Sequence, residues 1–368
     1  MKILLDLSPI KSGGGAQLAL NFIEKLKKCE RDFQCDFLAS DAFPFKDRLP
    51  KNKTIIAPSK YLNRILFENL KLKKIVRRKK YTHIYTFFGP GLPSYKGVRQ
   101  IVGVAYPIIC YDESKYWNNL SLDKFVTKKL LNYYRKRRLK KADFLIFETK
   151  IMQERCVSTL GFDKQKTLVL PPSPTVFLTD NDYVESSGVT KFLILSGTDT
   201  HKNIWRLIPL IKRAASDGLK FKIIASVKIE QFFSEYRKHI LVSDDYCLLD
   251  KYFEFLGPIP QDKIQEVYDR IDVVLNISDL ESFSNNYMEA WRCAKPILAS
   301  DRDFSRHICR ESAIYCEPHD LDSLYESIRK FVYKEYDVKS MVVCGKRYLA
   351  ELPSVEQKIE SLIKVFNI

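Results

Sequence analysis

The stretch from Ile271 to Asp301 constrains the fold more than any other part of the chain. It begins with a continuous apolar run, Ile271 to Ile277, and passes through a polar loop into a helical segment from about Asn286 to Cys293. A second apolar run follows at Pro296 to Ala299. Two buried strands joined by a helix are typical of a βαβ unit in a parallel sheet. In such sheets, ligands bind at the carboxyl ends of the strands, facing helix N-termini.

Two acids fall at this candidate ligand-binding edge. Glu281 lies in the loop after the first strand, and Glu289 lies one turn inside the helix. The spacing alone carries little information in a chain that is 29% charged. The context is informative, because an acid at a strand end, an acid on the next helix and a Lys-Pro-apolar strand ending in Ser-Asp occur together. The alternative is that both acids are ordinary solvated side chains, one of them near a helix N-terminus.

This segment resembles the retaining glycosyltransferases of the family 4 type. These enzymes have two Rossmann-like α/β domains facing across a cleft (the GT-B fold) and use a nucleotide-sugar donor. The matching positions are Glu281, Phe283, Glu289, Ala290, Pro296 and Asp301. The resemblance implies that Glu281 lies against the donor sugar and that Glu289 holds the ribose hydroxyls. It implies further donor contacts from the intervening loop, namely Ser282, Phe283, Ser284 and Asn285.

The length of 368 residues exceeds one ordinary core and suggests two domains. With the resemblance, we expect an acceptor-side domain over 1–177, a linker over 178–190, a nucleotide-sugar-binding domain over 191–352, and a final helix over 353–368 that crosses back to the first domain. No stretch approaches the roughly 18 apolar residues of a membrane span, and the amino terminus is typical of a strand rather than a signal peptide. Nine cysteines without a C-x-x-C pair favour reduced thiols in the cytoplasm.

The amino-terminal strand Lys2–Leu7 leads into a Gly-rich turn that contains Gly14 and Gly15, followed by a helical pattern from Ala16. Without Cβ atoms, backbone N–H groups can approach an anion, and the helix dipole favours negative charge. The G-x-G-x-x-G pattern of NAD sites is absent. The resemblance assigns this turn to the donor diphosphate and to the entrance for the acceptor. A plain tight turn is the alternative.

The strand Lys191–Ser196 leads through Thr198 to Lys202 and Asn203, which we expect to open a helix. A lysine at this place can lay its ammonium against a diphosphate, and the pair resembles the family's phosphate-binding lysine. Thr198 stands where relatives often carry Arg, so phosphate neutralisation is expected to depend more on Lys202 and backbone amides. Ile259 lies in a Gly-Pro-Ile-Pro turn that resembles the segment that receives the base. The alternative for Lys202 is an exposed lysine at a helix start.

The first half offers weaker candidates for the acceptor side. Tyr106 follows the strand Gln100–Ala105 at the place where many relatives carry a His. This departure weakens any claim about a side-chain catalyst from the first domain. Glu148 and Thr149 follow the strand Asp143–Phe147, where relatives place a Ser or Thr. We expect these three residues on the acceptor side of the site.

Basic residues are concentrated in the first half. Up to residue 175 there are 35 Lys+Arg against 15 Asp+Glu, and the remainder holds 26 against 30. The most basic helix, 123–141, carries an incomplete apolar stripe: Phe125, Leu130, Leu131, Tyr134 and Leu139. It could dock onto an anionic inner-membrane leaflet, face the core with a solvated basic side, or bind nucleic acid. No helix-turn-helix, RNA-binding sheet or zinc-finger spacing supports the third interpretation, so nucleic acid is not an expected partner.

The motifs together predict an enzyme, through the resemblance. The Asp-x-Asp triplets at 180–182 and 301–303 lack supporting features, so we expect no metal and no cofactor besides the nucleotide-sugar co-substrate. The prediction is a cytoplasmic, retaining glycosyltransferase at the inner face of a bacterial inner membrane, with Glu281 and Lys202 as catalytic residues. Its acceptor would be a lipid-linked saccharide or oligosaccharide in surface polysaccharide synthesis (O-antigen, capsule or lipopolysaccharide). The alternatives are a nucleotide-sugar epimerase or a phosphorylase of the same fold, and a non-catalytic polyanion-binding module.

Overall fold

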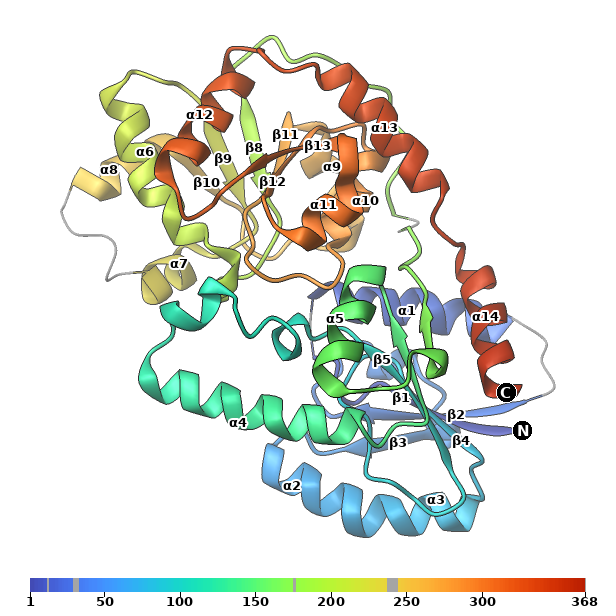
Figure 1. The fold of residues 1–368 in the computed structure, drawn as a ribbon. Coiled ribbons are helices and arrows are strands. Elements are labelled where there is room, and N and C mark those ends of the chain that lie inside the picture. The colour runs from blue at the N-terminus through green and yellow to red at the C-terminus, as the bar shows by residue number, and fades with distance from the viewer. Residues whose placement is uncertain (12, 29–32, 175–176, 237–243, 368) are drawn as a thin grey trace. The chain divides into compact units, whose positions relative to one another are not determined.

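The computed structural model describes residues 1–11, 13–28, 33–174, 177–236 and 244–367. The chain forms two compact units (Figure 1). The first comprises Met1–Asp112, Ser121–Ser173 and Pro353–Ile368, and the second comprises Glu113–Leu120 and Pro174–Leu352. Each unit is built on one parallel β-sheet flanked by helices. The predicted α/β class is therefore confirmed, and the final helix is part of the first unit.

The first sheet has seven strands in the order β3-β2-β1-β4-β5-β6-β7. They are β1 (Lys2–Asp6), β2 (Gln34–Ser40), β3 (Thr54–Ala57), β4 (His83–Thr86), β5 (Arg99–Val104), β6 (Phe144–Phe147) and β7 (Thr167–Val169). Successive residues of a strand point to opposite faces of a sheet. Ile3 and Leu5 of β1 accordingly pack with helices α1 (Gly13–Lys28) and α14 (Val355–Asn367). Leu4 faces the other way, toward α3 (Lys73–Lys79).

The remaining helices of the first unit are α2 (Tyr61–Leu66), a π-helical segment (Phe67–Leu72) that continues into α3, α4 (Leu122–Leu139) and α5 (Lys150–Leu160). A buried carboxylate joins two of them. Glu68 accepts from Arg64 Nε at 2.7 Å and from Arg138 Nη2 at 2.7 Å. Breaking such a buried pair is costly, because it leaves a charge uncompensated. Arg138 of α4 is therefore a structural cation that holds this helix against α2.

The second sheet has six strands in the order β10-β9-β8-β11-β12-β13. They are β8 (Lys191–Ile194), β9 (Lys222–Ala225), β10 (Phe253–Phe255), β11 (Val273–Asn276), β12 (Ile297–Ser300) and β13 (Ala313–Cys316). One face packs against α6 (Leu207–Ser216), α7 (Ile229–Tyr236), α8 (Asp244–Tyr252) and α12 (Leu321–Val332). The other packs against α9 (Ile264–Asp269), α10 (Asn285–Arg292), α11 (Asp303–Cys309) and α13 (Val338–Ala350). The predicted βαβ unit is β11-α10-β12.

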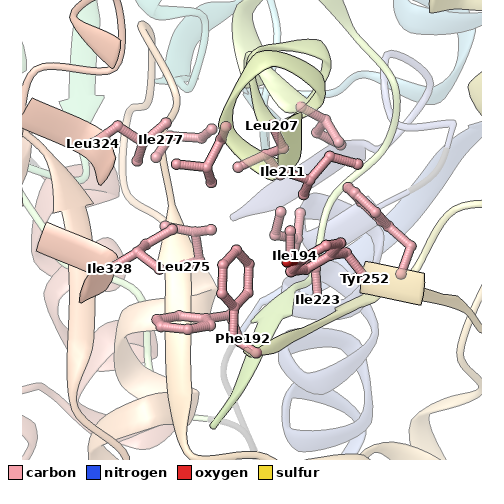
Figure 2. Close-up of a cluster of buried hydrophobic side chains, with 14 of the residues drawn as sticks. Phe192, Ile194, Leu207, Ile211, Ile223, Tyr252, Leu275, Ile277, Leu324 and Ile328 are labelled. Carbon is pink, nitrogen blue, oxygen red and sulfur yellow. The ribbon is translucent and has the colours of Figure 1, made fainter. Parts of the chain in front are cut away.

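Figure 2 shows how the first of these faces is filled. Alternate residues of adjacent strands, including Phe192, Ile223 and Leu275, meet Leu207 of α6 and Ile328 of α12. All of these side chains are buried, and burial of each such side chain contributes about 1.5–3 kcal/mol. The packed core thus fixes the strand ends from which the loops of the candidate site emerge.

Two helix starts differ from the sequence prediction. Helix α1 begins at Gly13, so Gly14 and Gly15 lie in its first turn. After β8, Thr200–Lys202 form a single 3-10 turn, Asn203 has φ 57°, and α6 begins only at Leu207. The left-handed conformation of Asn203 interrupts the helix, and Asn tolerates it better than most residues. The prediction that Lys202 and Asn203 open a helix is therefore wrong.

Within the described residues, none of the helices combines the length and the hydrophobicity that crossing a bilayer requires.

Candidate functional site

The candidate site lies at the carboxyl edge of the second sheet, where two loops meet. Strands β8 and β11 are neighbours in the sheet, so the loops that follow them lie side by side. Lys202 Nζ, from the first loop, lies 2.6 Å from Glu281 Oε1, from the second. The two side chains are only 19% and 12% exposed. The structure therefore brings the two predicted catalytic residues into direct contact.

Two further hydrogen bonds join these loops below the ion pair. Asn203 Nδ2 donates to the Ile277 carbonyl at 3.0 Å, and the Asp279 N–H donates to the His201 carbonyl at 2.8 Å. Asn203 is fully buried, so its side chain supports the loops from beneath. The left-handed backbone of Asn203 turns its side-chain amide toward the sheet. The neighbouring Lys202 side chain remains partly exposed.

Asp279 is a member of the site that the sequence analysis missed. It is 2% exposed. Each of its carboxylate oxygens lies 2.8 Å from His319 Nε2, and Oδ1 accepts from Arg302 Nη2 at 3.0 Å. His319 Nδ1 contacts a guanidinium nitrogen of Arg206. Because a guanidinium can only donate, Nδ1 is the acceptor and Nε2 carries the proton toward Asp279.

Charge balance in this cluster shifts the pKa values of its acids. Burial alone raises the pKa of Asp279, but the hydrogen bonds from His319 and Arg302 outweigh it and bring the pKa below its usual range. Arg302 also donates to both oxygens of Glu317 at 2.8 and 2.9 Å. That pair lowers the pKa of Glu317 to about 2. Asp279 lies only two residues before Glu281, but no sequence pattern indicates its partners, which come from loops after β12 and β13.

Glu289 lies on α10 beside a tyrosine of the neighbouring helix. The Tyr268 hydroxyl donates to Glu289 Oε2 at 3.0 Å. Burial raises the pKa of Glu289 to about 7, although this hydrogen bond opposes the shift. Unlike Lys202 and Glu281, which neutralise each other, Glu289 has no basic partner among the residues that the structure describes. A carboxyl group in this state can accept or donate a hydrogen bond near neutral pH.

The other predicted donor-side residues of the second unit lie in the loop that leads into α10 and in the loops after β8 and β10. Ser282 and Ser284 are buried. Ser284 is the N-cap residue of α10, yet its hydroxyl accepts from Asn276 Nδ2 at 3.0 Å and makes no capping hydrogen bond. Asn285 opens the helix. Phe283 and Ile259 pack partly buried against the core, and the Thr198 carbonyl accepts from the Tyr236 hydroxyl at 2.8 Å.

The predicted acceptor-side residues belong to the first unit. Tyr106 follows β5, and the Arg135 guanidinium lies 4.4 Å from the centre of its ring. Glu148 and Thr149 are buried at the end of β6. Thr149 caps α5, with its hydroxyl accepting from the Met152 N–H at 3.3 Å. Thr149 thus has a structural role that the sequence analysis did not anticipate.

The two Asp-x-Asp triplets are engaged by neighbouring side chains. Asp301 accepts from Arg306 Nη2 at 2.8 Å, and Asp182 lies 3.4 Å from Lys346 Nζ. Across the described part of the chain, no three His, Cys, Asp or Glu side chains gather closely enough to hold a metal ion.

The chain is similar to known proteins in two ways, by a sequence match within the second unit and by a structural likeness over the whole chain. Residues 193–333, which include Lys202, Glu281 and Glu289, match the family model described as Glycosyl transferases group 1. No curated protein sequence matches the chain.

Solved structures resemble the chain over nearly its full length, and three of them serve as examples. Sucrose-phosphate synthase from Thermosynechococcus elongatus is 16% identical with a TM-score of 0.75, covering 100% of this chain and 99% of that one. Anabaena HepE, in complex with UDP-glucose, is 14% identical with a TM-score of 0.72, covering 100% and 99%. WaaG, a glycosyltransferase involved in lipopolysaccharide biosynthesis, is 13% identical with a TM-score of 0.72, covering 98% of each chain.

Proposed function

Because the chain is a glycosyltransferase of the GT-B fold, we propose that it moves a sugar, with retention of configuration and without a metal, from a nucleotide-sugar donor to a lipid-linked saccharide or oligosaccharide. The contact between Lys202 and Glu281 carries this proposal. This contact places a cation that can bind a diphosphate beside a carboxylate that can bind sugar hydroxyls. Both residues lie at one edge of the second sheet, within the region that matches the family model.

The donor diphosphate would lie between Lys202 and the start of α10. The Ser284 hydroxyl does not cap that helix, and although the Tyr287 N–H donates to the Ser284 carbonyl at 3.1 Å, the helix start favours an anion. The Lys202 ammonium adds a charge-assisted hydrogen bond. Glu289, within the same helix, would accept from the ribose hydroxyls. HepE was crystallised with UDP and with UDP-glucose, which makes a uridine nucleotide the first donor to test.

The chemistry follows from where charge develops. The sugar leaves through an oxocarbenium-like transition state while negative charge builds on the diphosphate oxygens. Lys202 and the N–H groups of α10 stabilise that charge without reorganising. Glu281, released from Lys202 by the phosphate, would hold the sugar hydroxyls. The leaving phosphate takes the proton of the acceptor hydroxyl, so bond formation occurs on the face from which the nucleotide departs.

Three alternatives are less well supported. The match over residues 193–333 favours a transferase over a nucleotide-sugar epimerase, a phosphorylase or a non-catalytic polyanion-binding module. We place the reaction in bacterial surface polysaccharide synthesis, such as O-antigen, capsule or lipopolysaccharide. WaaG, which resembles this chain, is named for lipopolysaccharide biosynthesis, and the basic first unit supports the same assignment.

The first unit also presents a surface suited to an anionic membrane. Helix α4 exposes apolar side chains at helical spacing: Leu122 (80% exposed), Val126, Leu130 and Tyr133. The adjoining run from α2 exposes Leu62 (73%), Leu66 and Leu70. The two helices are neighbours, because the rings of Tyr61 and Tyr134 lie 6.1 Å apart. Exposed apolar stripes of this kind mark interaction surfaces.

The cations near these stripes divide into two groups. On α4, the ammonium groups of Lys129 and Lys136 lie 3.2 and 3.0 Å from the Asp112 carboxylate, and Arg138 forms an ion pair with Glu68. These three cations are therefore engaged in ion pairs within the first unit. Exposed cations border the stripes: Lys71, Lys73, Lys74, Arg77, Arg78, Lys124, Arg137, Lys140 and Lys141. The exposed stripe differs from the one that the sequence suggested, since Leu139 is buried. We propose that this surface docks onto anionic lipid at the inner face of the membrane.

A donor screen tests the enzymatic proposal. Thermal unfolding of the full chain with UDP, GDP and TDP sugars, in the presence of a chelator, should show a rise in Tm for at least one of them. With that donor, Lys202→Met should reduce the rate of sugar transfer, and it should also reduce the rate at which the donor is hydrolysed. Lys263→Met is the control, since Lys263 is exposed and forms its ion pair with Glu266, which is also exposed. If no nucleotide sugar raises the Tm, or if Lys202→Met leaves turnover unchanged, the proposal is wrong.

A further inference from the structure

The second unit has a cavity at the opposite edge of its sheet from Lys202 and Glu281. Its volume is about 270 Å³. Thr190, Asp272 and Val273 line it at the amino ends of β8 and β11, and Lys295 and Pro296 line it just before β12. Each of these strands is four residues long, so the two edges are separated by roughly 13 Å. The cavity is therefore distinct from the donor site.

Apolar and aromatic groups form the floor and one wall of this cavity. Val273, Pro296 and Phe331 are buried, and the ring of Phe331 lies 4.7 Å from that of Tyr336. Tyr183, which is half-buried, contributes a further ring from the segment before β8. Such rings offer flat apolar faces against which the C–H face of a small ring can pack.

Three of the six charged side chains that line the cavity are already paired with other protein groups. Lys334 Nζ lies 2.9 Å from Glu185 Oε1 and donates to the Ser186 carbonyl at 2.8 Å. Asp337 caps α13, accepting from the Ser340 N–H at 3.1 Å and its hydroxyl at 2.6 Å. These residues shape the rim of the cavity and have little capacity left for a ligand.

Lys295 and Asp272 have more capacity left for a ligand. Among the described residues, the Lys295 ammonium has neither a hydrogen-bond nor an ion-pair partner, and burial lowers its pKa although Asp272 opposes the shift. Asp272 Oδ2 accepts from the Lys191 N–H at 2.8 Å, while Oδ1 receives no hydrogen bond from the described part of the chain. The cavity thus offers a strong donor, the Lys295 ammonium, and a strong acceptor, Asp272 Oδ1, that are partly exposed and have capacity left for a ligand.

We propose that this cavity binds the ring of a neutral sugar. The lining contains three lysines (Lys295, Lys334, Lys339) and three acids (Glu185, Asp272, Asp337), so its charge is balanced and does not favour a polyanion. An ammonium and a carboxylate together bind adjacent hydroxyls, one as acceptor and one as donor, while the aromatic wall covers the C–H face. The volume is near the lower end of the roughly 300–1,000 Å³ range of ligand sites, which suits one or two sugar rings.

The origin of that sugar rests on the proposed function. In a glycosyltransferase with a saccharide acceptor, the cavity would hold a sugar unit of the acceptor away from the reacting hydroxyl. A free monosaccharide has the same chemistry, so the comparison of single rings with trisaccharides distinguishes the two sources. A trisaccharide that binds more tightly than its monosaccharide indicates the acceptor chain, and equal affinities indicate a free sugar.

Saturation-transfer NMR on the full-length protein tests the site. The probes are the methyl glycosides of glucose, galactose, mannose and N-acetylglucosamine, with maltotriose and chitotriose. We expect at least one to bind, and we expect Lys295→Met and Tyr183→Ala each to weaken it about tenfold or more, as loss of a charged hydrogen bond or a stacking wall implies. Lys346→Met is the control, because Lys346 lies on α13 and outside the cavity lining. Unchanged Tm values would show that each variant folds.

Three outcomes would overturn the site: no probe binds, binding persists in both variants, or Lys202→Met abolishes it, which would place the sugar at the donor edge. The nucleotide-sugar response of the Tm should be unchanged by Lys295→Met. A sugar that binds through Lys295 in a chain that binds no nucleotide sugar would uphold this site and contradict the proposed function.

Discussion

The ammonium of Lys202 lies 2.6 Å from the carboxylate of Glu281, across 79 positions of the sequence. Each group neutralises the other in the ligand-free chain. The diphosphate of a donor would have to displace Glu281 from Lys202, which frees the carboxylate to turn toward the sugar. Donor binding and the positioning of the second catalytic group would then be one event.

Substitution of Glu281 should have opposite effects on binding and on turnover. In Glu281→Gln the lysine no longer has a competing anion, so the affinity for UDP or GDP should rise roughly two- to fivefold, the value of a partly exposed ion pair. Transfer should fall, because the sugar loses its carboxylate. Titration calorimetry measures the first quantity and a donor-turnover assay the second.

Glu266→Gln is the matched control, since Glu266 is exposed and forms an ion pair with the exposed Lys263 at 2.7 Å. If Glu281→Gln weakened nucleotide binding as much as Lys202→Met does, the two side chains would act on the donor together and not in competition.

Loss of Asp279 should destabilise the second unit strongly. Asp279→Ala leaves the N–H of the His319 ring without its acceptor and removes one of the two carboxylate partners of Arg302, which keeps Glu317. A buried donor left without a partner costs about 1–3 kcal/mol. Chemical denaturation followed by circular dichroism measures the shift. Asp301→Ala is the control, because its partner Arg306 is exposed and such pairs contribute less than about 1 kcal/mol. Equal losses of unfolding free energy in the two variants would mean that Asp279 stabilises the protein no more than an exposed ion pair does.

Stability should depend on pH through Glu289. Its pKa is raised from 4.5 to about 7 by burial, so the folded chain holds this proton more tightly than the unfolded chain does between those values. Its contribution is fully present below pH 4.5 and is lost as pH rises through 7. Glu289→Gln should therefore raise the free energy of unfolding at pH 8 relative to wild type, by roughly 1–3 kcal/mol, and change it little at pH 5. If the free energy of unfolding of Glu289→Gln changed with pH in the same way as that of the wild type, the assignment to Glu289 would be contradicted.

Vesicle sedimentation should separate the apolar and the electrostatic parts of membrane binding. Leu66→Ser with Leu130→Ser should reduce binding to vesicles of phosphatidylglycerol and phosphatidylethanolamine several-fold, because exposed apolar area drives insertion. Rising salt should weaken the wild type as charges are screened. Val184→Ser with Val343→Ser removes two exposed apolar groups of the second unit and should have no effect. Binding that ignores the anionic lipid fraction would contradict a docking surface of this kind.

Several features of the site were predictable because their signals are local. The alternation of apolar runs and helical patterns indicated parallel strands, and the position of Lys202 and Glu281 just after β8 and β11 indicated one shared edge. The start of α6 was not predictable in this way. Asn203 adopts a left-handed conformation to bury its amide against Ile277, and that requirement comes from a loop 74 positions away.

By itself, the sequence determined the α/β class and the βαβ segment from β11 to β12, since hydrophobic periodicity is a property of neighbouring residues. The candidate donor residues were predicted through the resemblance to a known family. Only the tertiary structure decided which of those residues touch: the pairing of Lys202 with Glu281, the partners of Asp279 and the environment that raises the pKa of Glu289. The physical reason is that strand order and burial set these contacts. Both depend on how distant segments pack, because the free energy of an ion pair or a proton depends on the groups and the solvent around it.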